Sequence, residues 1–220
     1  MSDRIRIALV HATPVAVDPI AQSFRAIWPE ADPVGILDDG LALDRAAAGT
    51  LTDDLSRRIV ALGQYGLSTG AKAVLYTCSA FGPAIEEAAR LFPVPVLKPN
   101  EAMFEEALGH GGNLGMIATF SPAVAMMEQE FAEEAARAKP GARLTSWLAT
   151  GAIEALRAGD ADRHNRRVAE GVAALGERDA ILLAHFSTSR AGEACRALTA
   201  RPVLSSPDAA VRKLRRLLEA

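Results

Sequence analysis

Short apolar segments alternate along the chain with longer segments in which apolar residues recur every three or four positions. Residues 5–10 form the first apolar run, and residues 17–27 carry apolar side chains at helical spacing before Pro29. This pattern predicts a buried strand followed by an amphipathic helix that ends at the proline. Because strand and helix patterns continue to alternate, we expect parallel strands joined by crossover helices.

The same alternation runs through two successive series of predicted elements. The first continues with a helix over 51–62, a strand over 73–76, a helix over 83–91 and a strand over 95–97. The second has strands over 114–118, 180–184 and 202–204, a helix that carries Val124, Met127 and Phe131, and helical stretches around 153, 168–175 and 190–198.

The order of elements repeats between the two series. A shift of 107 positions lays residues 95–97 on 202–204 and residues 73–75 on 180–182, and it lays Cys78 on His185. A shift of 106 places Ala12-Thr13 on Ala118-Thr119, each at the end of a first strand. Several segments that match in the same order indicate a duplicated fold.

We therefore expect an α/β fold made of two pseudo-symmetric domains, each a Rossmann-like parallel sheet with helices on its faces. Residues 1–100, completed by a C-terminal helix over 207–220, form the N-terminal half. Residues 101–206 form the C-terminal half. Because ligands of open parallel sheets bind beyond the carboxyl ends of the strands, we expect the active site in the cleft between the halves.

The segments that follow the predicted strands are rich in hydroxyl groups. Each of these hydroxyls also fits a purely structural role as a helix N-cap, as in Thr13-Pro14. Taken together, uncharged donors beside helix N-termini favour an anion, because the first N–H groups of a helix lack partners. We infer a small carboxylic acid as the ligand. The predicted substrate-binding residues are Thr13, Thr77, Ser79, Thr119, Ser121 and Ser187.

Cys78 is the residue that we expect to carry the chemistry. A lone cysteine is often a small buried hydrophobe, but Cys78 follows a strand, lies between two hydroxyl residues and precedes a helix. Such a position is expected to lower the pKa of a thiol and to make thiolate available near neutral pH. Cys195 lies within a predicted helix instead, and packing is its expected role.

His185 takes the position in the second series that Cys78 has in the first. Three roles stay open for it: proton transfer near pH 7, a hydrogen bond to a carboxylate without proton transfer, and orientation of its neighbours. The remaining histidines are not expected to act in catalysis. His11 is expected in the wall of the site, whereas His110 and His164 lie in polar stretches that we expect to be solvated.

Composition and charge indicate which partners and which location to expect. The net charge of −3 arises from 24 basic and 27 acidic residues, which favours neither nucleic acid nor an anionic membrane as a partner. No apolar run reaches the roughly 20 residues of a membrane span, and the charged start is unlike a secretory signal, so we expect a cytoplasmic location.

Motifs for cofactors and metals are also lacking. The glycine-rich segment 109–113 precedes a predicted strand, whereas dinucleotide loops follow one, and the two cysteines lack ligand spacing. We therefore expect no cofactor and no metal. The arginine-rich segments 163–167 and 212–216 are expected to be solvated helix faces.

Three motifs resemble a known family in their order and spacing. They are Thr77-Cys78-Ser79, Ala118-Thr119-x-Ser121-Pro122 and Ile181-Leu182-Leu183-Ala184-x-x-Ser187. The chain as a whole resembles the aspartate/glutamate racemase superfamily, which includes hydantoin racemase, maleate isomerase and arylmalonate decarboxylase. The resemblance implies two α/β halves, a small carboxylate substrate and no cofactor. Dimers are common in this superfamily, so a homodimer is expected.

The resemblance also implies a mechanism. In members with two thiols, one cysteine removes the proton α to a carboxylate and the other reprotonates the opposite face. Cys78 matches the first cysteine, whereas His185 stands in the second position and departs from the two-thiol pattern. The first hypothesis is a racemase or epimerase of an amino acid or related small acid. The alternatives are a lyase in which Cys78 alone protonates a carbanion, and a binding protein without catalysis.

Overall fold

The computed structural model describes residues 4–219, except for the side chain of Pro122. The chain folds as two compact units. Unit 1 extends to Pro99 and resumes at Ala210, and unit 2 spans Asn100–Ala209. Within the described residues, no helix is both long and apolar enough to cross a bilayer.

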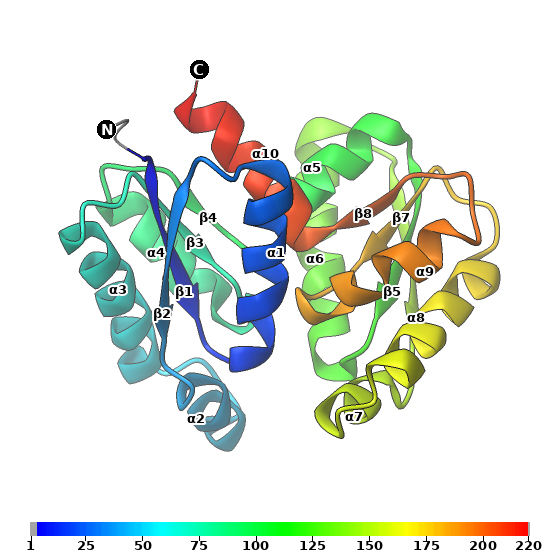
Figure 1. Ribbon diagram of the computed structural model, residues 1–220, viewed down its shortest axis with the longest axis horizontal. Coiled ribbons are helices and arrows are strands. Elements are labelled where there is room, and N and C mark those ends of the chain that lie inside the picture. Colours follow the sequence, from blue (N-terminus) through cyan, green and yellow to red (C-terminus); the bar gives the residue numbers. More distant parts are fainter. Residues whose placement is uncertain (1–3, 220) are drawn as a thin grey trace. The chain divides into compact units, whose positions relative to one another are not determined.

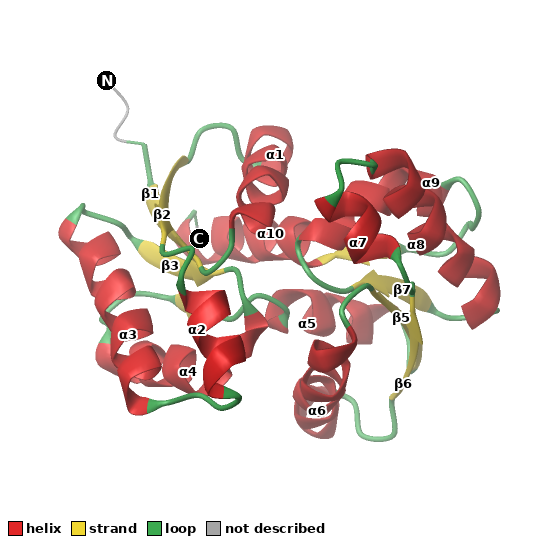
Figure 2. Cartoon of the chain, turned by 90° about the horizontal axis from the view of Figure 1, so that it is seen from below, coloured by secondary structure: helices red, strands yellow, loops and turns green. Residues whose placement is uncertain are grey.

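Unit 1 is a parallel sheet with helices on both faces (Figure 1). Its strand order is β2-β1-β3-β4. Ala8 and Val10 of the central strand pack with apolar residues of α3 and α4 on one face, and Figure 2 shows α1 on the opposite face. The strands are β1 (Arg6–His11), β2 (Asp32–Leu37), β3 (Ala73–Tyr76) and β4 (Val96–Leu97), and the helices are α1 (Val17–Ile27), α2 (Leu41–Ala48), α3 (Asp53–Ser68), α4 (Gly82–Leu91) and the later part of α10 (Ser206–Leu218).

Unit 2 has the same architecture, with the strand order β6-β5-β7-β8. Alternate residues of its central strand face opposite layers: Met116 packs with α5 and α6, and Ile117 packs with α8. Figure 2 shows α6 and α8 on opposite sides of this sheet. The strands are β5 (Asn113–Ala118), β6 (Arg143–Leu148), β7 (Ala180–Leu183) and β8 (Val203–Ser205), and the helices are α5 (Glu101–His110), α6 (Ser121–Ala138), α7 (Ala152–Arg157), α8 (Ala161–Leu175) and α9 (Gly192–Arg196).

Strand register confirms the predicted duplication. Ile7 pairs with Ala73 in unit 1, and Leu114 pairs with Ala180 in unit 2, so both partners are displaced by 107 positions. The same displacement relates the β3–β4 pairs to the β7–β8 pairs. The predicted shift of 106 at the first strand is wrong, because β1 ends at His11 and β5 ends at Ala118.

A glycine lets one long helix of each unit lie close to its sheet. A Cβ at Gly66 of α3 would lie 2.5 Å from the Cβ of Ala8, and one at Gly171 of α8 would lie 2.6 Å from the ring of Trp147. Neither distance is tolerated by a real side chain, so both positions need glycine for the close approach. The two halves therefore share a packing solution as well as a topology.

Candidate active site

In unit 1, the loop after β3 places Cys78 at the carboxyl end of the sheet, two residues beyond Tyr76. The thiol is half-buried, and the backbone N–H of Ala80 hydrogen-bonds its sulfur. Burial raises the pKa of the Cys78 thiol, while the Ala80 hydrogen bond and the charge of Arg45 oppose that rise. The prediction of a lowered thiol pKa is therefore wrong: desolvation outweighs the local donors, and the resting thiol is protonated at neutral pH.

Arg45 is a functional candidate that sequence reasoning missed. It lies on α2, close enough for its positive charge to act on Cys78. Its side chain is half-buried, and its buried Nε has no hydrogen-bond partner among the described residues. A buried guanidinium N–H without an acceptor is unfavourable, and a carboxylate is the acceptor that fits its planar geometry.

An ion-pair network holds α2 against α3. Arg58 of α3 pairs with Asp38 at 2.7 Å and with Asp44 at 2.5 Å. Asp38 directly follows β2, and Asp44 lies on α2 beside Arg45. The hydrogen bonds that Arg58 donates to both carboxylates raise the pKa of its guanidinium group further. Arg45 thus extends from a helix that charged groups fix at the carboxyl end of the sheet.

A buried hydrogen-bond chain supports the loop that carries Cys78. The Thr77 hydroxyl donates to the carbonyl of Val10 at 3.3 Å and lies 2.9 Å from Nδ1 of His11. Because the hydroxyl proton is used on Val10, Nδ1–H of His11 is the donor to Thr77. Burial lowers the pKa of His11 to about 4, so its ring is neutral. Thr77 therefore uses its hydroxyl inside unit 1.

In unit 2, two buried threonines meet at the carboxyl end of the sheet. Thr119 follows β5, and its Oγ1 lies 3.4 Å from Oγ1 of Thr188. Sequence reasoning chose Ser187 instead of Thr188, because both lie in one hydroxyl-rich loop without a periodicity that shows which side chain points inward. Ser187 is also buried, whereas Ser121 is exposed at the start of α6.

His185 occupies in unit 2 the position that Cys78 has in unit 1, two residues beyond its strand. Its φ of 69° is the only positive value among the described non-glycine residues. Such backbone conformations are uncommon outside glycine and cluster at functional sites. Burial lowers the pKa of His185 to about 4, and its buried Nε2 has no hydrogen-bond partner among the described residues. A ring that is neutral at pH 7 fits the hydrogen-bonding alternative better than proton exchange near neutrality.

The remaining residues that the sequence analysis discussed differ in how deeply their side chains are buried. Thr13 and Ser79 are half-buried in unit 1, and His110 is exposed. The prediction that His164 is solvated is wrong: the side chain lies on the inner face of α8 and is completely buried. Cys195 is also completely buried, and burial raises its pKa to about 11, which fits the predicted packing role.

The structure therefore groups the candidate residues within each unit. Unit 1 brings Cys78 into the range of Arg45 and ties Thr77 to His11. Unit 2 joins Thr119 to Thr188 and holds His185 in a strained loop. Within residues 4–219, no cluster of three or more histidine, cysteine or acidic side chains is arranged to hold a metal.

Comparisons with known proteins agree with this architecture. The sequence profile of the Asp/Glu/hydantoin racemase family matches residues 10–214. A search of curated protein sequences found no match. The fold is similar to that of glutamate racemase RacE1 from Bacillus anthracis, with a TM-score of 0.71 and 13% identity over 100% of this chain and 83% of that one.

Two further solved structures extend the similarity. Aspartate racemase from Picrophilus torridus gives a TM-score of 0.75 and 14% identity over 96% of this chain and 93% of that chain. A cysteine-substituted mutant of arylmalonate decarboxylase gives a TM-score of 0.65 and 19% identity over 96% of this chain and 92% of that chain. The similar folds thus include both racemases and a decarboxylase.

Proposed function

Because the chain belongs to the Asp/Glu/hydantoin racemase family, we propose that it is a cofactor-independent racemase or epimerase. Its substrate is an amino acid or related small acid, and the reaction takes place at the carbon α to the carboxylate. The observation that carries the proposal is the environment of Cys78. Its half-buried thiol lies at the end of a parallel strand, within range of the Arg45 guanidinium, whose buried Nε–H has no partner in the described part of the chain.

Cys78 is the acid/base group in this proposal. Removal of the α-proton by the thiolate leaves an enolate-like charge beside the carboxylate, and return of a proton from a thiol restores the carbon acid. The Ala80 N–H and the charge of Arg45 favour the thiolate against the cost of burial. Fixed donors aimed at developing charge are commonly worth several kcal/mol to such reactions.

Arg45 binds the substrate carboxylate in this proposal. A carboxylate would accept the buried Nε–H and neutralise the half-buried charge. Thr13 and Ser79 are half-buried at the same end of the unit 1 sheet, and we assign them, together with Ser121 and Ser187, to substrate binding. The hydroxyls of Thr77 and Thr119 are assigned a supporting role, because each lies against another buried side chain.

His185 is assigned to hydrogen bonding with the substrate. Burial keeps its ring neutral at pH 7, and its buried Nε2 has no hydrogen-bond partner within residues 4–219, so it is available to a substrate. A neutral imidazole with a pKa of about 4 is a poor proton donor and acceptor at neutral pH. The two halves of the reaction are therefore unequal. Cys78 exchanges a proton rapidly on one face of the α-carbon, and inversion requires a slower proton delivery to the opposite face, from the His185 imidazole or from water.

A lyase is the second candidate. Two observations favour it: the second thiol position holds His185, and burial favours the protonated, acidic form of Cys78. Protonation of a carbanion left by decarboxylation needs only that acidic form. The fold similarity to arylmalonate decarboxylase is consistent with this alternative.

Incubation with candidate acids in deuterated water separates these functions. The panel includes both enantiomers of aspartate and glutamate, allantoin and arylmalonates, analysed by NMR and chiral chromatography. A racemase introduces deuterium at the α-carbon and produces the other enantiomer, whereas a lyase produces a deuterated product that has lost a group. A protein that binds an acid from the panel without exchange or product contradicts both catalytic proposals.

A further inference from the structure

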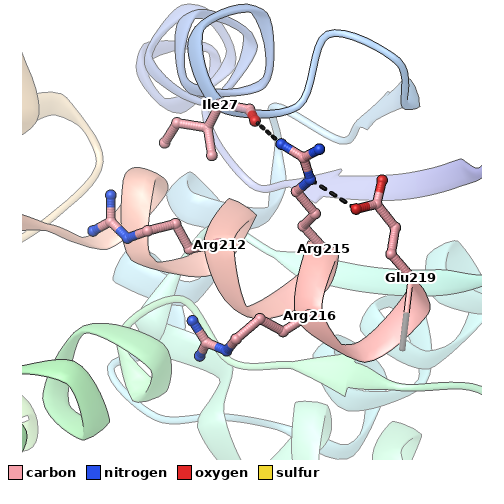
Figure 3. Close-up of a pocket in the computed structure, with 5 residues that line it drawn as sticks. All are labelled: Ile27, Arg212, Arg215, Arg216 and Glu219. Atoms are coloured by element: carbon pink, nitrogen blue, oxygen red, sulfur yellow. Dashed lines mark hydrogen bonds and ion pairs between the residues drawn. The ribbon is translucent and has the colours of Figure 1, made fainter.

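The hollow beside the last helix of unit 1 lies away from Cys78. Its lining residues are Ile27 of α1 and Arg212, Arg215, Arg216 and Glu219 of the C-terminal segment (Figure 3). Ile27 ends α1 shortly before β2 begins, so the hollow is at the amino ends of the strands. Arg215 donates to the Ile27 carbonyl at 2.8 Å and pairs with Glu219 at 2.8 Å, and Figure 3 shows the other two guanidinium groups pointing away from it. Selection of a substrate by unit 1 therefore depends on the carboxyl end of its sheet.

Four basic side chains belong to segments at that carboxyl end. Arg45 lies on α2, Arg57 and Arg58 lie in the first turns of α3, and Lys98 directly follows β4. The last three are already paired with carboxylates: Arg57 with Asp54 at 3.1 Å, Arg58 with Asp38 at 2.7 Å, and Lys98 with Glu86 at 3.0 Å. Among the described residues, Arg45 is the one member of this group that has no carboxylate partner. Unit 1 thus offers an available cation to one substrate carboxylate.

Acidic side chains outnumber basic ones in the segment that carries Arg45. From the end of β2 to the first turns of α3, residues 38–58 include five aspartates and three arginines. A second carboxylate on a substrate in unit 1 would meet this excess of negative charge, and like charges at close range repel each other. The charge of the segment therefore favours a substrate with a single carboxylate.

Two apolar side chains are exposed at the same end of unit 1. Leu37, the last residue of β2, is 46% exposed, and Val17, the first residue of α1, is 37% exposed. Ile36 packs into the core with α3, so the alternation of a strand points Leu37 to the face that α1 covers. A substrate side chain that covers these residues gains free energy only if it is apolar, because contact then removes apolar surface from water.

Leu37 lies along the same sheet edge as the loop that carries Cys78. It pairs in register with His11 of β1, and the His11 ring hydrogen-bonds Thr77, the residue before Cys78. Neighbouring strands are about 4.8 Å apart, so two strand spacings place Leu37 about 10 Å from this loop. An amino acid whose α-carbon contacts Cys78 can therefore extend its side chain toward Leu37.

We infer that the site selects acids with one carboxylate and an apolar side chain, and that Leu37 determines this selectivity. The inference rests on the proposed function and names its substrate class. Arg45 holds the carboxylate, Leu37 contacts the side chain, and the aspartates of residues 38–58 disfavour a second negative charge. In unit 2, Arg190 of the loop after His185 already has an interaction partner, so it is not an open second anchor.

Leucine and aspartate are the matched probes for this inference. Their side chains have the same branched skeleton, with two methyl groups in leucine where aspartate has two carboxylate oxygens. Calorimetric titration of the whole protein with both enantiomers of each measures binding, and deuterium incorporation at the α-carbon measures exchange. We expect leucine to bind about tenfold or more tightly than aspartate, because apolar groups in a matching site contribute on that order.

Leu37→Arg should reduce or reverse this preference, because it adds a second cation for the aspartate side chain. We expect the ratio of the two affinities to change about tenfold, the contribution of one charged hydrogen bond. The matched control is Leu91→Arg, which adds the same charge at a leucine that is 61% exposed and ends α4, at the amino end of the sheet. The control should keep the preference of the unmodified protein.

The two measurements distinguish failure of the inference from failure of the proposed function. Tighter binding of aspartate, together with its exchange, overturns the inference and supports the racemase. Tighter binding of leucine without exchange supports the inference and contradicts the racemase. Equal affinities, or no binding of either amino acid, would overturn the inference. An unchanged ratio in a folded Leu37→Arg protein, or an equal change in Leu91→Arg, would overturn the role of Leu37.

Discussion

At the residue scale, the protonation of Cys78 reflects a balance between burial and local donors. Burial raises the pKa of the thiol, and the Ala80 N–H and the charge of Arg45 lower it. An ordinary thiol has a pKa of about 8.5. The pKa of Cys78 lies above this value. If Cys78 acts as a base, it must be a thiolate, and activity rises as the pH rises through the pKa of Cys78. If it acts as an acid, it must be a thiol, and activity falls over the same pH range.

We expect the racemisation rate to rise with pH into the alkaline range. Arg45→Met removes the charge that opposes the effect of burial, so it should move this rise to higher pH and also weaken binding of the carboxylate. The measurement is kcat/KM against pH for the unmodified protein and the variant. Arg57→Met is the control, because it removes a charge from an exposed residue of α3. A rate that falls with rising pH supports the lyase, and an equal shift in the control contradicts the role of Arg45.

At the element scale, Asp179 holds the turn before β5. One of its carboxylate oxygens accepts the backbone N–H groups of Gly112 and Asn113, each at 2.8 Å. A Cβ at Gly111 would lie 2.1 Å from that oxygen. The glycine-rich segment that precedes β5 is thus explained by a carboxylate that packs against its backbone.

Asp179→Asn should lower the stability of the folded protein at pH values above about 4. The backbone hydrogen bonds lower the pKa of Asp179, so its contribution is complete above the unfolded value of about 4 and is lost as pH falls through the folded pKa. Thermal unfolding from pH 3 to pH 7 should show a difference between the two proteins that narrows toward acid. A constant difference across this range would contradict the assignment.

Gly66→Ala should destabilise unit 1, because the new methyl group would overlap the Cβ of Ala8. Insertion of a methyl group into a closely packed core costs about 1–3 kcal/mol. Gly109→Ala is the matched control, since nothing lies within 4 Å of a Cβ built at that position of α5. Chemical denaturation should show a loss for the first variant alone. Equal stabilities would contradict the close approach of α3 to β1.

At the scale of the whole molecule, the sequence predicted the strands that are covered on both faces. Residues 73–76 and 180–183 form continuous apolar runs because helices cover both sides of each central strand. The edge strands β2 and β6 were missed, because β2 contains Pro33 and Gly35 and β6 alternates with polar residues. Helix α5 was missed as well.

The elements that the apolar pattern did not predict also explain which site residue was missed. Cys78 was chosen because it follows a strand and precedes a helix, and His185 because the repeat places it at the equivalent position; their catalytic roles stay predictions. Arg45 was not found, since it lies on a short helix that follows an unpredicted strand. The direction of the Cys78 pKa shift was wrong, because a lone sequence shows the strand end and the helix start but not the depth of burial.

His185→Cys tests whether the two positions that the duplication makes equivalent, 78 and 185, take part in the same reaction. A second thiol at the position equivalent to Cys78 should increase racemisation, because a thiol exchanges protons near neutral pH more readily than this buried imidazole. Rates in both directions, measured with each enantiomer, are the readout. Circular dichroism checks that the variant is folded. A folded variant with unchanged or lower racemisation would contradict the equivalence of the two positions in the reaction.

The central claim is that the sulfur of Cys78 exchanges a proton with the α-carbon of a small acid. The most direct measurement is the rate of deuterium incorporation at that carbon by Cys78→Ala and by Cys195→Ala, the second of which removes the buried structural thiol. The account predicts that exchange is lost in Cys78→Ala and kept in Cys195→Ala. Exchange at the unmodified rate in a folded Cys78→Ala protein would contradict it.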